Sequence, residues 1–343
     1  MRTLRQNARW HSQGWALLPL LILLLTALPG TPPRAEFSAA QVRQAERTWL
    51  EASGWVLARR RASDSWNPAL DPALSGLVGG GEGIFTTSLG QKEAKQTAAQ
   101  SGWCRVVACL LDSLRIGPTD TVAVTMTGSF PGLNLAVLAT LEAGNIPYRC
   151  VASLGASTYG ANDSTFNWPT VEGWLRTRGL LRQGSVVVTP GGSGDRLNGQ
   201  FLSTQRAAEE VLRGIPGSLH PSNLPQAVEL RRDVLGPRKH LALLINVGGG
   251  HPVMGGNDYG RSVPGGLLGE ADAPPAAVLA EGEAGTPGVL QLYHEEGLPV
   301  LHFIDIVRLA HRWGLPSPPS QAQTPPEVAH ACRPAPARKG GSK

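Results

Sequence analysis

Short apolar runs alternate with glycine-rich turns and longer helical patterns through the middle of the chain. Residues 121–127 form a β-rich run, residues 128–132 a turn, and residues 133–143 a helical pattern. Residues 147–151 then begin a second strand. Because this unit has the length that a parallel crossover requires, the pattern predicts a strand–helix–strand unit.

The same order recurs further along the chain. Strands are expected at 185–189 and 241–247, each running into a glycine-rich turn, with a helix over about 203–213 between them, and residues 289–313 indicate helix, strand and helix. Continuous apolar strands are typical of a parallel sheet that is covered on both faces. We therefore expect an α/β fold with a mostly parallel sheet, helices on both faces, and the glycine-rich turns gathered at the carboxyl ends of the strands.

A helical and loop segment is expected ahead of this domain. Residues 38–116 contain two helical patterns, over about 38–61 and 91–114, which we expect to pack on the α/β domain at 117–315. The last segment, 316–343, is rich in proline and basic residues, and its composition predicts disorder.

The N-terminal segment predicts export. A basic N-terminus at 1–14 precedes an uncharged apolar run at 15–28, which as a helix covers about 21 Å, short of the roughly 30 Å bilayer core and within the range of a cleavable signal peptide. Trp10 and Trp15 flank the run as interfacial anchors would. We expect an uncleaved transmembrane anchor over 15–30 with the body outside the cytoplasm, and cleavage with secretion is the alternative.

The net charge does not indicate a nucleic-acid partner. The formal charge is +5, but four Arg lie in residues 1–35 and four basic residues in 333–343, both without acidic residues. The remaining body has 23 basic against 26 acidic residues, a net charge of −3. Binding to nucleic acid needs Lys and Arg clustered on the folded surface. We therefore expect no nucleic-acid partner.

The four cysteines are few and scattered, at Cys104, Cys109, Cys150 and Cys332. No C-x-x-C pair is present, so neither a zinc site nor a redox motif is indicated. We expect buried, reduced side chains. The sequence predicts no metal site and identifies no cofactor.

The turn after residue 127 is the first candidate site. Gly128, Ser129 and Asn134 lie between a predicted strand and a predicted helix, where backbone N–H groups attract anions. Ser129 can cap the helix, contact a ligand, or act as a nucleophile, although the G-x-S-x-G elbow pattern is absent.

Two later turns are expected at the same sheet edge. Gly192 and Ser193 belong to a loop that lacks the Walker and dinucleotide patterns. Gly249 and Gly250 precede His251, which is a candidate acid, base or metal ligand, or else a structural histidine. None of these patterns identifies a ligand by itself.

Asn162 and Asp163 lie in a further loop, where they can line a polar pocket or form an ordinary turn. The catalytic candidates are therefore Ser129, Asp163 and His251. Asp195, which follows the Gly192 loop, is a further acidic candidate.

Three segments together resemble a known family. They are the run 122–137, the run 156–168 containing Ser157, Tyr159 and Asn162, and Asn246 with the three glycines that follow it, all behind an N-terminal apolar segment. This combination resembles the bacterial poly-gamma-glutamate system protein family over about residues 40–315. The resemblance implies a membrane-associated accessory protein of poly-γ-glutamate synthesis and export, with the synthesis and export subunits as partners and the anionic polymer as a possible ligand. It implies no catalytic residue.

The leading prediction is thus a membrane-anchored, extracytoplasmic accessory protein of poly-γ-glutamate biosynthesis, export or processing. The alternative is an exported α/β hydrolase or transferase that acts on a cell-envelope substrate through the loops at Ser129, Asp163, Asp195 and His251. Hydrogen-bonding distance between such groups would support the alternative.

Overall fold

A six-stranded sheet forms the centre of the computed structural model, which describes residues 36–197, 202–269 and 282–319. The strand order is β5-β3-β2-β6-β8-β7, with β7 antiparallel to β8 and the other neighbouring pairs parallel. The strands are β2 (Val122–Met126), β3 (Tyr148–Ser153), β5 (Val187–Thr189), β6 (Leu243–Val247), β7 (Gly266–Leu268) and β8 (Val300–Phe303). The predicted mostly parallel α/β fold is confirmed.

The strand order reverses between β2 and β6. From β2 the chain moves outward to β3 and β5, and it then returns to place β6 on the other side of β2, with Val122 paired to Leu243. Crossovers leave in opposite directions at such a point, so a crevice opens beyond the carboxyl ends of the two strands.

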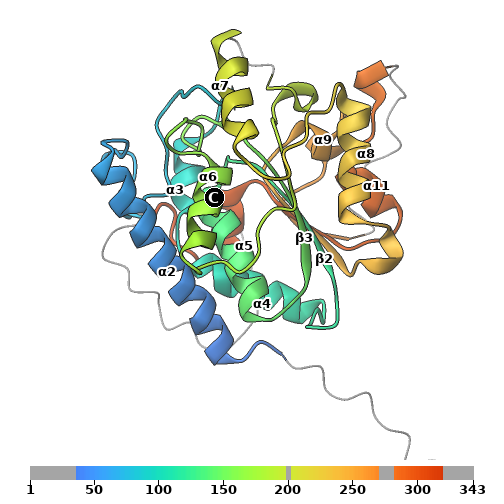
Figure 1. Ribbon diagram of the computed structural model, residues 1–343. Coiled ribbons are helices and arrows are strands. Elements are labelled where there is room, and N and C mark those ends of the chain that lie inside the picture. Colours follow the sequence, from blue (N-terminus) through green and yellow to red (C-terminus); the bar gives the residue numbers. More distant parts are fainter. Residues whose placement is uncertain (1–35, 198–201, 270–281, 320–343) are drawn as a thin grey trace, which may run out of the picture. The chain divides into compact units, whose positions relative to one another are not determined.

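Helices cover both faces of the sheet (Figure 1). Val122 and Val124 on β2 face one apolar cluster, while Ala123 faces the other. The first face packs α2 (Ala39–Ala62), α3 (Lys92–Ala98), α4 (Gly102–Ser113), α5 (Pro131–Ala143), α6 (Trp168–Thr177) and α12 (Ile306–Arg312). The second packs α8 (Leu224–Leu235), α9 (His251–Met254), α10 (Tyr259–Ser262) and α11 (Val289–Glu295), and α7 (Leu202–Arg213) lies over a third, smaller cluster.

The helix predicted over about residues 38–61 is confirmed as α2. Ser38 and Gln41 form a reciprocal capping box at its start, which satisfies N–H groups that a helix leaves free. Trp49 is buried and donates from Nε1 to the Gly132 carbonyl at 2.8 Å, so α2 is tied to the start of α5.

The single helix predicted over 91–114 is wrong, because the chain forms α3 and α4 with a break between them. The Thr97 carbonyl accepts hydrogen bonds from Gln100 Nε2 at 2.7 Å and Trp103 Nε1 at 2.9 Å, so side chains satisfy it where the helix stops. The break lets α3 lie in a different direction from α4, against α12.

Two short strands form a second, parallel sheet that the sequence did not indicate. They are β1 (Thr86–Ser88) and β4 (Ala156–Ser157). Their pairing fastens the segment that leads into α3 to the loop after β3. The remaining short elements are 3₁₀ turns, η1 (Ser193–Asp195), η2 (Arg238–His240) and η4 (Gly282–Gly285).

The predicted membrane anchor at 15–30 lies outside the described residues. Within residues 36–197, 202–269 and 282–319, no helix combines the length and apolar character needed to cross a bilayer. Most of the predicted tail also lies outside the description, but Ser317 contacts Thr97 between their hydroxyl oxygens at 2.7 Å. The folded part therefore continues past residue 315.

The cysteines differ in part from expectation. Cys104 and Cys150 are buried and free, as predicted. Cys109 is disulfide-bonded, which corrects the expectation of four reduced thiols. Cys332 lies outside the described residues.

Candidate functional site

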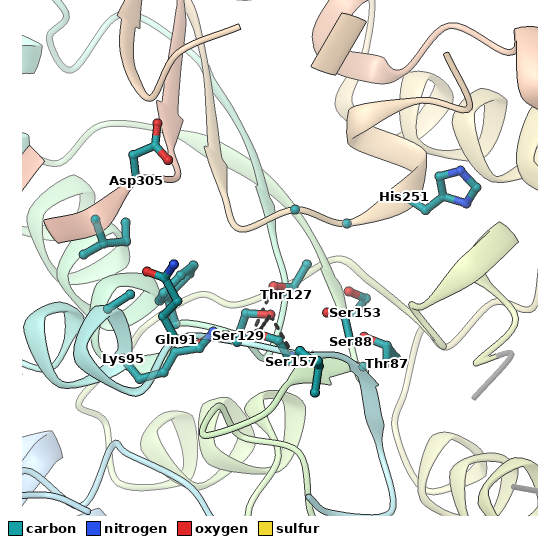
Figure 2. A pocket seen from close by; sticks show the side chains of 18 of the residues that line it. Thr87, Ser88, Gln91, Lys95, Thr127, Ser129, Ser153, Ser157, His251 and Asp305 are labelled. Carbon is teal, nitrogen blue, oxygen red and sulfur yellow. Dashed lines mark hydrogen bonds between the residues drawn. The ribbon is translucent and has the colours of Figure 1, made fainter. Parts of the chain in front are cut away.

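A cavity of about 1070 Å³ opens at the carboxyl edge of the sheet, over the point where the strand order reverses. The loops after five strands contribute to its wall, together with β1 and α3 (Figure 2). From the loops come Thr127 and Ser129, Gly155 and Ser157, Gly192 and Ser193, Gly249, Gly250 and His251, and Asp305. This is the position at which doubly wound sheets bind their ligands.

Ser129 occupies the turn between β2 and α5. Its backbone N–H donates to Thr127 Oγ1 at 3.2 Å, and Pro131 begins the helix that follows. Gly128 leaves no room for a side chain, because a Cβ there would lie 2.8 Å from the Ala161 carbonyl oxygen. The Ser129 hydroxyl does not cap α5, whose N-cap Phe130 has no side-chain hydrogen bond. The hydroxyl is therefore free for other contacts.

Ser157 and Lys95 complete a chain of contacts with Ser129. Lys95 Nζ donates to Ser157 Oγ at 2.6 Å and to the Ser129 carbonyl at 2.8 Å. Ser157 Oγ donates to Ser129 Oγ at 3.3 Å, and the Ser157 backbone N–H donates to the same oxygen at 3.1 Å. Figure 2 shows Lys95 extending from α3 toward the two serines. Three residues far apart in sequence thus form one connected polar group.

Burial changes the chemistry of Lys95. The side chain is 3% exposed, and its Nζ also lies 3.9 Å from the centre of the Phe130 ring. Desolvation of the charged amine lowers the pKa of Lys95 from 10.5 to about 7, and no neighbouring carboxylate opposes the shift. At neutral pH a large fraction of the amine is therefore uncharged and able to accept a proton.

A backbone donor lies next to Ser129. The Phe130 N–H belongs to the residue after Ser129, at the start of α5, and it has no hydrogen-bond acceptor among the described residues. In serine hydrolases the N–H that follows the nucleophile commonly stabilises the oxyanion of the tetrahedral intermediate. The turn thus offers a hydroxyl and an unused N–H side by side.

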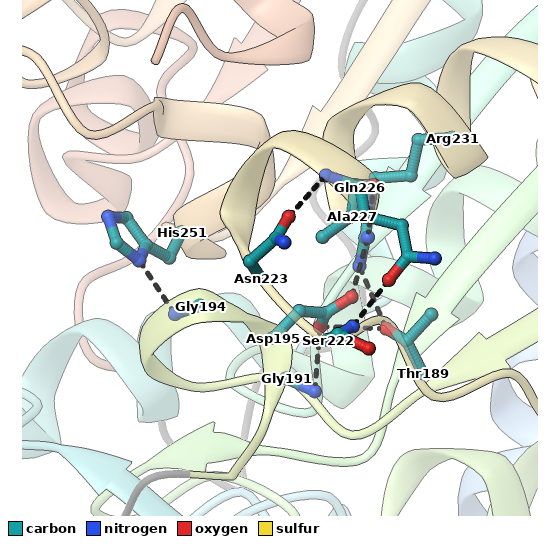
Figure 3. Close-up of polar contacts among 10 residues, drawn as sticks. All are labelled: Thr189, Gly191, Gly194, Asp195, Ser222, Asn223, Gln226, Ala227, Arg231 and His251. Carbon is teal, nitrogen blue, oxygen red and sulfur yellow. Dashed lines mark hydrogen bonds and ion pairs between the residues drawn. The ribbon is translucent and has the colours of Figure 1, made fainter. Parts of the chain in front are cut away.

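The loop after β5, which contributes Gly192 and Ser193 to the cavity wall, is built around Asp195. Its Oδ2 pairs with Arg231 Nη1 at 2.7 Å, and its Oδ1 accepts from Thr189 Oγ1 at 2.9 Å and the Gly191 N–H at 2.8 Å (Figure 3). Both charged side chains are almost fully buried. Asp195 is therefore buried, holds the loop after β5 and does not line the cavity.

His251 is hydrogen-bonded to the same loop. Its Nδ1 accepts from the Gly194 N–H at 2.9 Å, which places the ring proton of the neutral imidazole on Nε2. Burial lowers the pKa of His251 below 6.5. His251 and Ser129 line the same cavity, but no hydrogen bond joins them.

Asn246 holds the glycine turn that follows β6. Its Nδ2 donates to the Gly248 carbonyl at 2.7 Å, and its Oδ1 accepts from Thr125 Oγ1 at 2.9 Å. Gly248 has φ +94°, and a Cβ there would lie 2.5 Å from Thr127 Oγ1. Asn246 also contacts the buried His302 Nδ1 at 2.9 Å. The asparagine thus serves the turn rather than a ligand.

Five candidates from the sequence do not line the cavity, namely Gly128, Asn134, Asn162, Asp163 and Asp195. Asn134 is fully buried and donates to the Thr127 carbonyl at 2.8 Å, and Asn162 donates to Gly81 and Thr86. Asp163 organises its own turn through Thr165. The structure brings together Ser129, Gly192, Ser193, Gly249, Gly250 and His251 around the cavity, while Gly128 lies in the turn before Ser129 and packs closely against the Ala161 carbonyl.

Sequence reasoning missed Lys95 as a site residue. It lies in a Lys- and Glu-containing helical stretch that is typical of a solvated helix face, and no spacing connects it to Ser129 or Ser157. Within the described ranges, no group of three His, Cys, Asp or Glu side chains is placed to hold a metal ion.

Comparison of the chain with family models, with curated proteins and with solved structures gives no match.

Proposed function

We propose that this protein is an exported serine hydrolase or acyltransferase in which Ser129 is the nucleophile, Ser157 relays its proton and Lys95 is the general base. The observation that carries the proposal is the continuous contact from Lys95 Nζ through Ser157 Oγ to Ser129 Oγ on the wall of the cavity. A nucleophile next to a base that is itself oriented by its neighbours is the usual arrangement for covalent catalysis.

The contacts suggest how the proton moves. In the resting arrangement Ser157 Oγ donates to Ser129 Oγ. When the amine of Lys95 is neutral, both hydroxyls turn, so that Ser129 donates to Ser157 Oγ and Ser157 donates to Lys95 Nζ. Ser129 Oγ then attacks the carbonyl carbon of an ester or amide while its proton passes to Ser157 Oγ, and the Ser157 proton passes to the neutral amine of Lys95. The negative charge that develops on the substrate oxygen can be met by the Phe130 N–H. When the tetrahedral intermediate collapses, the protonated amine returns its proton through Ser157 to the departing alcohol or amine.

The acyl group is then held as an ester on Ser129. Attack by water releases a carboxylic acid and completes hydrolysis, whereas attack by an amine or alcohol of a second substrate completes acyl transfer. In either case, Lys95 again accepts the proton of the attacking group through Ser157. The relay is thus used twice in each cycle.

The cellular setting that we propose is a membrane-anchored, extracytoplasmic step of poly-γ-glutamate processing. The resemblance of the sequence supports it, and so does the apolar segment at 15–30. The disulfide at Cys109 is in keeping with an oxidising compartment. Poly-γ-glutamate is joined by amide bonds, which are the bonds that a serine hydrolase or acyltransferase cleaves or remakes.

The reaction is tested with a fluorophosphonate probe, which modifies activated serines, at pH 8. We expect labelling of the wild type at Ser129, located by peptide mass spectrometry, and loss of labelling in Ser129→Ala. Ser101→Ala removes a serine of similar burial outside the cavity and serves as the matched control. An unlabelled wild type, or labelling that survives in Ser129→Ala, would overturn the proposal.

The setting is tested separately. A reporter fused after Lys343 should be active only outside the cytoplasm, and the protein should stay with membranes after a carbonate wash. In a strain that makes the polymer, deletion of the gene should alter its amount, length or attachment. Unchanged polymer would contradict the setting but leave the reaction open to the labelling test.

A further inference from the structure

The cavity wall formed by α10 and α12 is cationic. Arg261 lies on α10 and Arg308 on α12, and both line the cavity that contains Ser129. The acidic side chain lining the same cavity in the described residues is that of Asp305. Two arginines against one carboxylate give this part of the cavity a net positive charge, so it favours an anionic occupant although the protein body as a whole is slightly acidic.

Arg308 is positioned by its neighbours but keeps most of its donors. Its Nη2 donates to the Gly265 carbonyl at 2.8 Å and lies 3.4 Å from Asp305 Oδ2. Its Nε and Nη1 groups have no acceptor among the described residues. The side chain is 50% exposed, so a ligand in the cavity can reach it.

Arg261 repeats this arrangement. Its Nη2 pairs with Asp258 Oδ1 at 3.1 Å, which leaves the other edge of the guanidinium without an acceptor in the described part of the chain. The contact of Arg308 with Gly265 brings the α12 guanidinium to the segment that follows Arg261. A planar fork of N–H donors matches the two oxygens of a carboxylate.

We infer that Arg308, together with Arg261, forms a subsite for a carboxylate on the acyl part of the substrate, so that the protein acts on carboxylate-bearing acyl donors. The inference rests on the proposed function for the reaction, but not for the binding of the anion. Arg308 is a specificity-determining residue here, because it holds the end of the acyl chain remote from the bond that Ser129 attacks.

Two ester probes test the subsite in the full protein. Mono-4-nitrophenyl glutarate carries a terminal carboxylate, whereas 4-nitrophenyl butanoate is neutral. We expect Arg308→Gln to lower kcat/KM for the glutarate ester about 10- to 100-fold, mainly by raising KM, because hydrogen bonds to a charged group are lost. For the neutral ester, kcat/KM should change less than about twofold in the same variant.

Arg312→Gln is the matched control, since Arg312 has the same charge on the same helix but does not line the cavity. Arg312→Gln should leave the ratio of kcat/KM for the glutarate ester to kcat/KM for the butanoate ester unchanged. An equal loss for both esters in Arg308→Gln, or no loss for either, would overturn the subsite.

A binding measurement separates this inference from the proposed reaction. Titration calorimetry of Ser129→Ala with glutarate should show binding that Arg308→Gln weakens at least about tenfold. If neither ester is hydrolysed but this binding is found, the subsite stands and the hydrolase proposal fails. If Ser129 hydrolyses both esters without preference for the charged one, the hydrolase proposal stands and the subsite fails. Inorganic phosphate that binds as well as glutarate would overturn recognition of a carboxylate.

Discussion

Two buried basic side chains, Arg231 and Lys95, are held in opposite ways. Arg231 pairs with Asp195 at 2.7 Å and also contacts Thr189, so its charge is matched. Lys95 contacts the Ser129 carbonyl and the Ser157 hydroxyl, neither of which carries a charge. The ion pair of Arg231 and Asp195 fastens a loop, whereas desolvation lowers the pKa of the unmatched Lys95 amine to about 7. Because both side chains are buried, the comparison teaches that the missing counter-ion separates the proposed base from the structural cation.

Arg60 is an intermediate case that sharpens this comparison. It is buried, and its guanidinium donates to the carbonyls of Gly76 and Val78, both at 2.7 Å. Desolvation lowers the pKa of Arg60 to about 10, while the carboxylates of Asp71 and Asp163 oppose the shift, so the group stays charged at neutral pH. The high intrinsic pKa of a guanidinium and these two carboxylates together keep Arg60 from acting as a base, whereas Lys95 has neither.

The largest effect is expected from Lys95→Met. Loss of the general base should lower the hydrolysis rate of a 4-nitrophenyl ester about 100- to 10,000-fold. The free energy of unfolding in urea should stay the same or rise, since a buried amine no longer has to be desolvated. A variant that retains the rate but unfolds more easily would make Lys95 a structural residue and remove the contrast with Arg231.

Asp195→Ala tests the opposite member of the comparison. It leaves Arg231 buried without a partner and should lower the free energy of unfolding by about 3–5 kcal/mol. Asp258→Ala removes an exposed ion pair and should cost less than about 1 kcal/mol. If Arg231→Met in the Asp195→Ala background restores no stability, the unpaired charge is not the cause of the loss.

The pH dependence of the rate comes next in size. In the proposed reaction the neutral amine of Lys95 is the active form, and the pKa of Lys95 is lowered to about 7. The rate should therefore rise about tenfold per pH unit below pH 7 and level off above it. The profile should be the same in His251→Phe. An acid limb that disappears in this variant would assign the titration to His251 instead.

The smallest effect concerns the hydrogen bond from Gly194 to His251. His251→Phe should lower the free energy of unfolding at pH 7.5 by about 0.5–1.5 kcal/mol. Because the pKa of His251 is lowered in the folded protein, the unfolded chain binds more protons as the pH falls below 6.5. The free energy of unfolding of the wild type therefore falls toward that of His251→Phe at low pH. Urea unfolding at pH 5.5 should show a smaller difference between the two proteins, and a larger one would contradict this account.

Local sequence patterns predicted the elements that carry the sheet. The apolar runs that became β2, β6 and β8 are buried on both sides, so continuous hydrophobicity was a direct guide. The antiparallel β7 was missed because its three residues, with glycine first, carry no alternation that distinguishes them from a turn.

The site was predicted only where it depends on local chain geometry. Ser129 and His251 follow strands, and topology alone brings such turns to one edge. Lys95 reaches the site through pairing of β1 with β4 and through the break between α3 and α4. Both depend on contacts between residues far apart in the chain, for which a single sequence contains no pattern.

The pairing of β1 with β4 separates loss of activity from loss of the fold. It spans only a few residues, Thr86 with Ala156 and Ser88 with Ser157, outside the six-stranded sheet. A pair this short has little stability of its own and opens at a lower free energy than the central strands. On warming, amide protons of β1 and α3 should exchange with deuterium before those of β2 and β6. The proposed ester hydrolysis should therefore stop at temperatures where circular dichroism still shows an intact sheet. The activity should return on cooling.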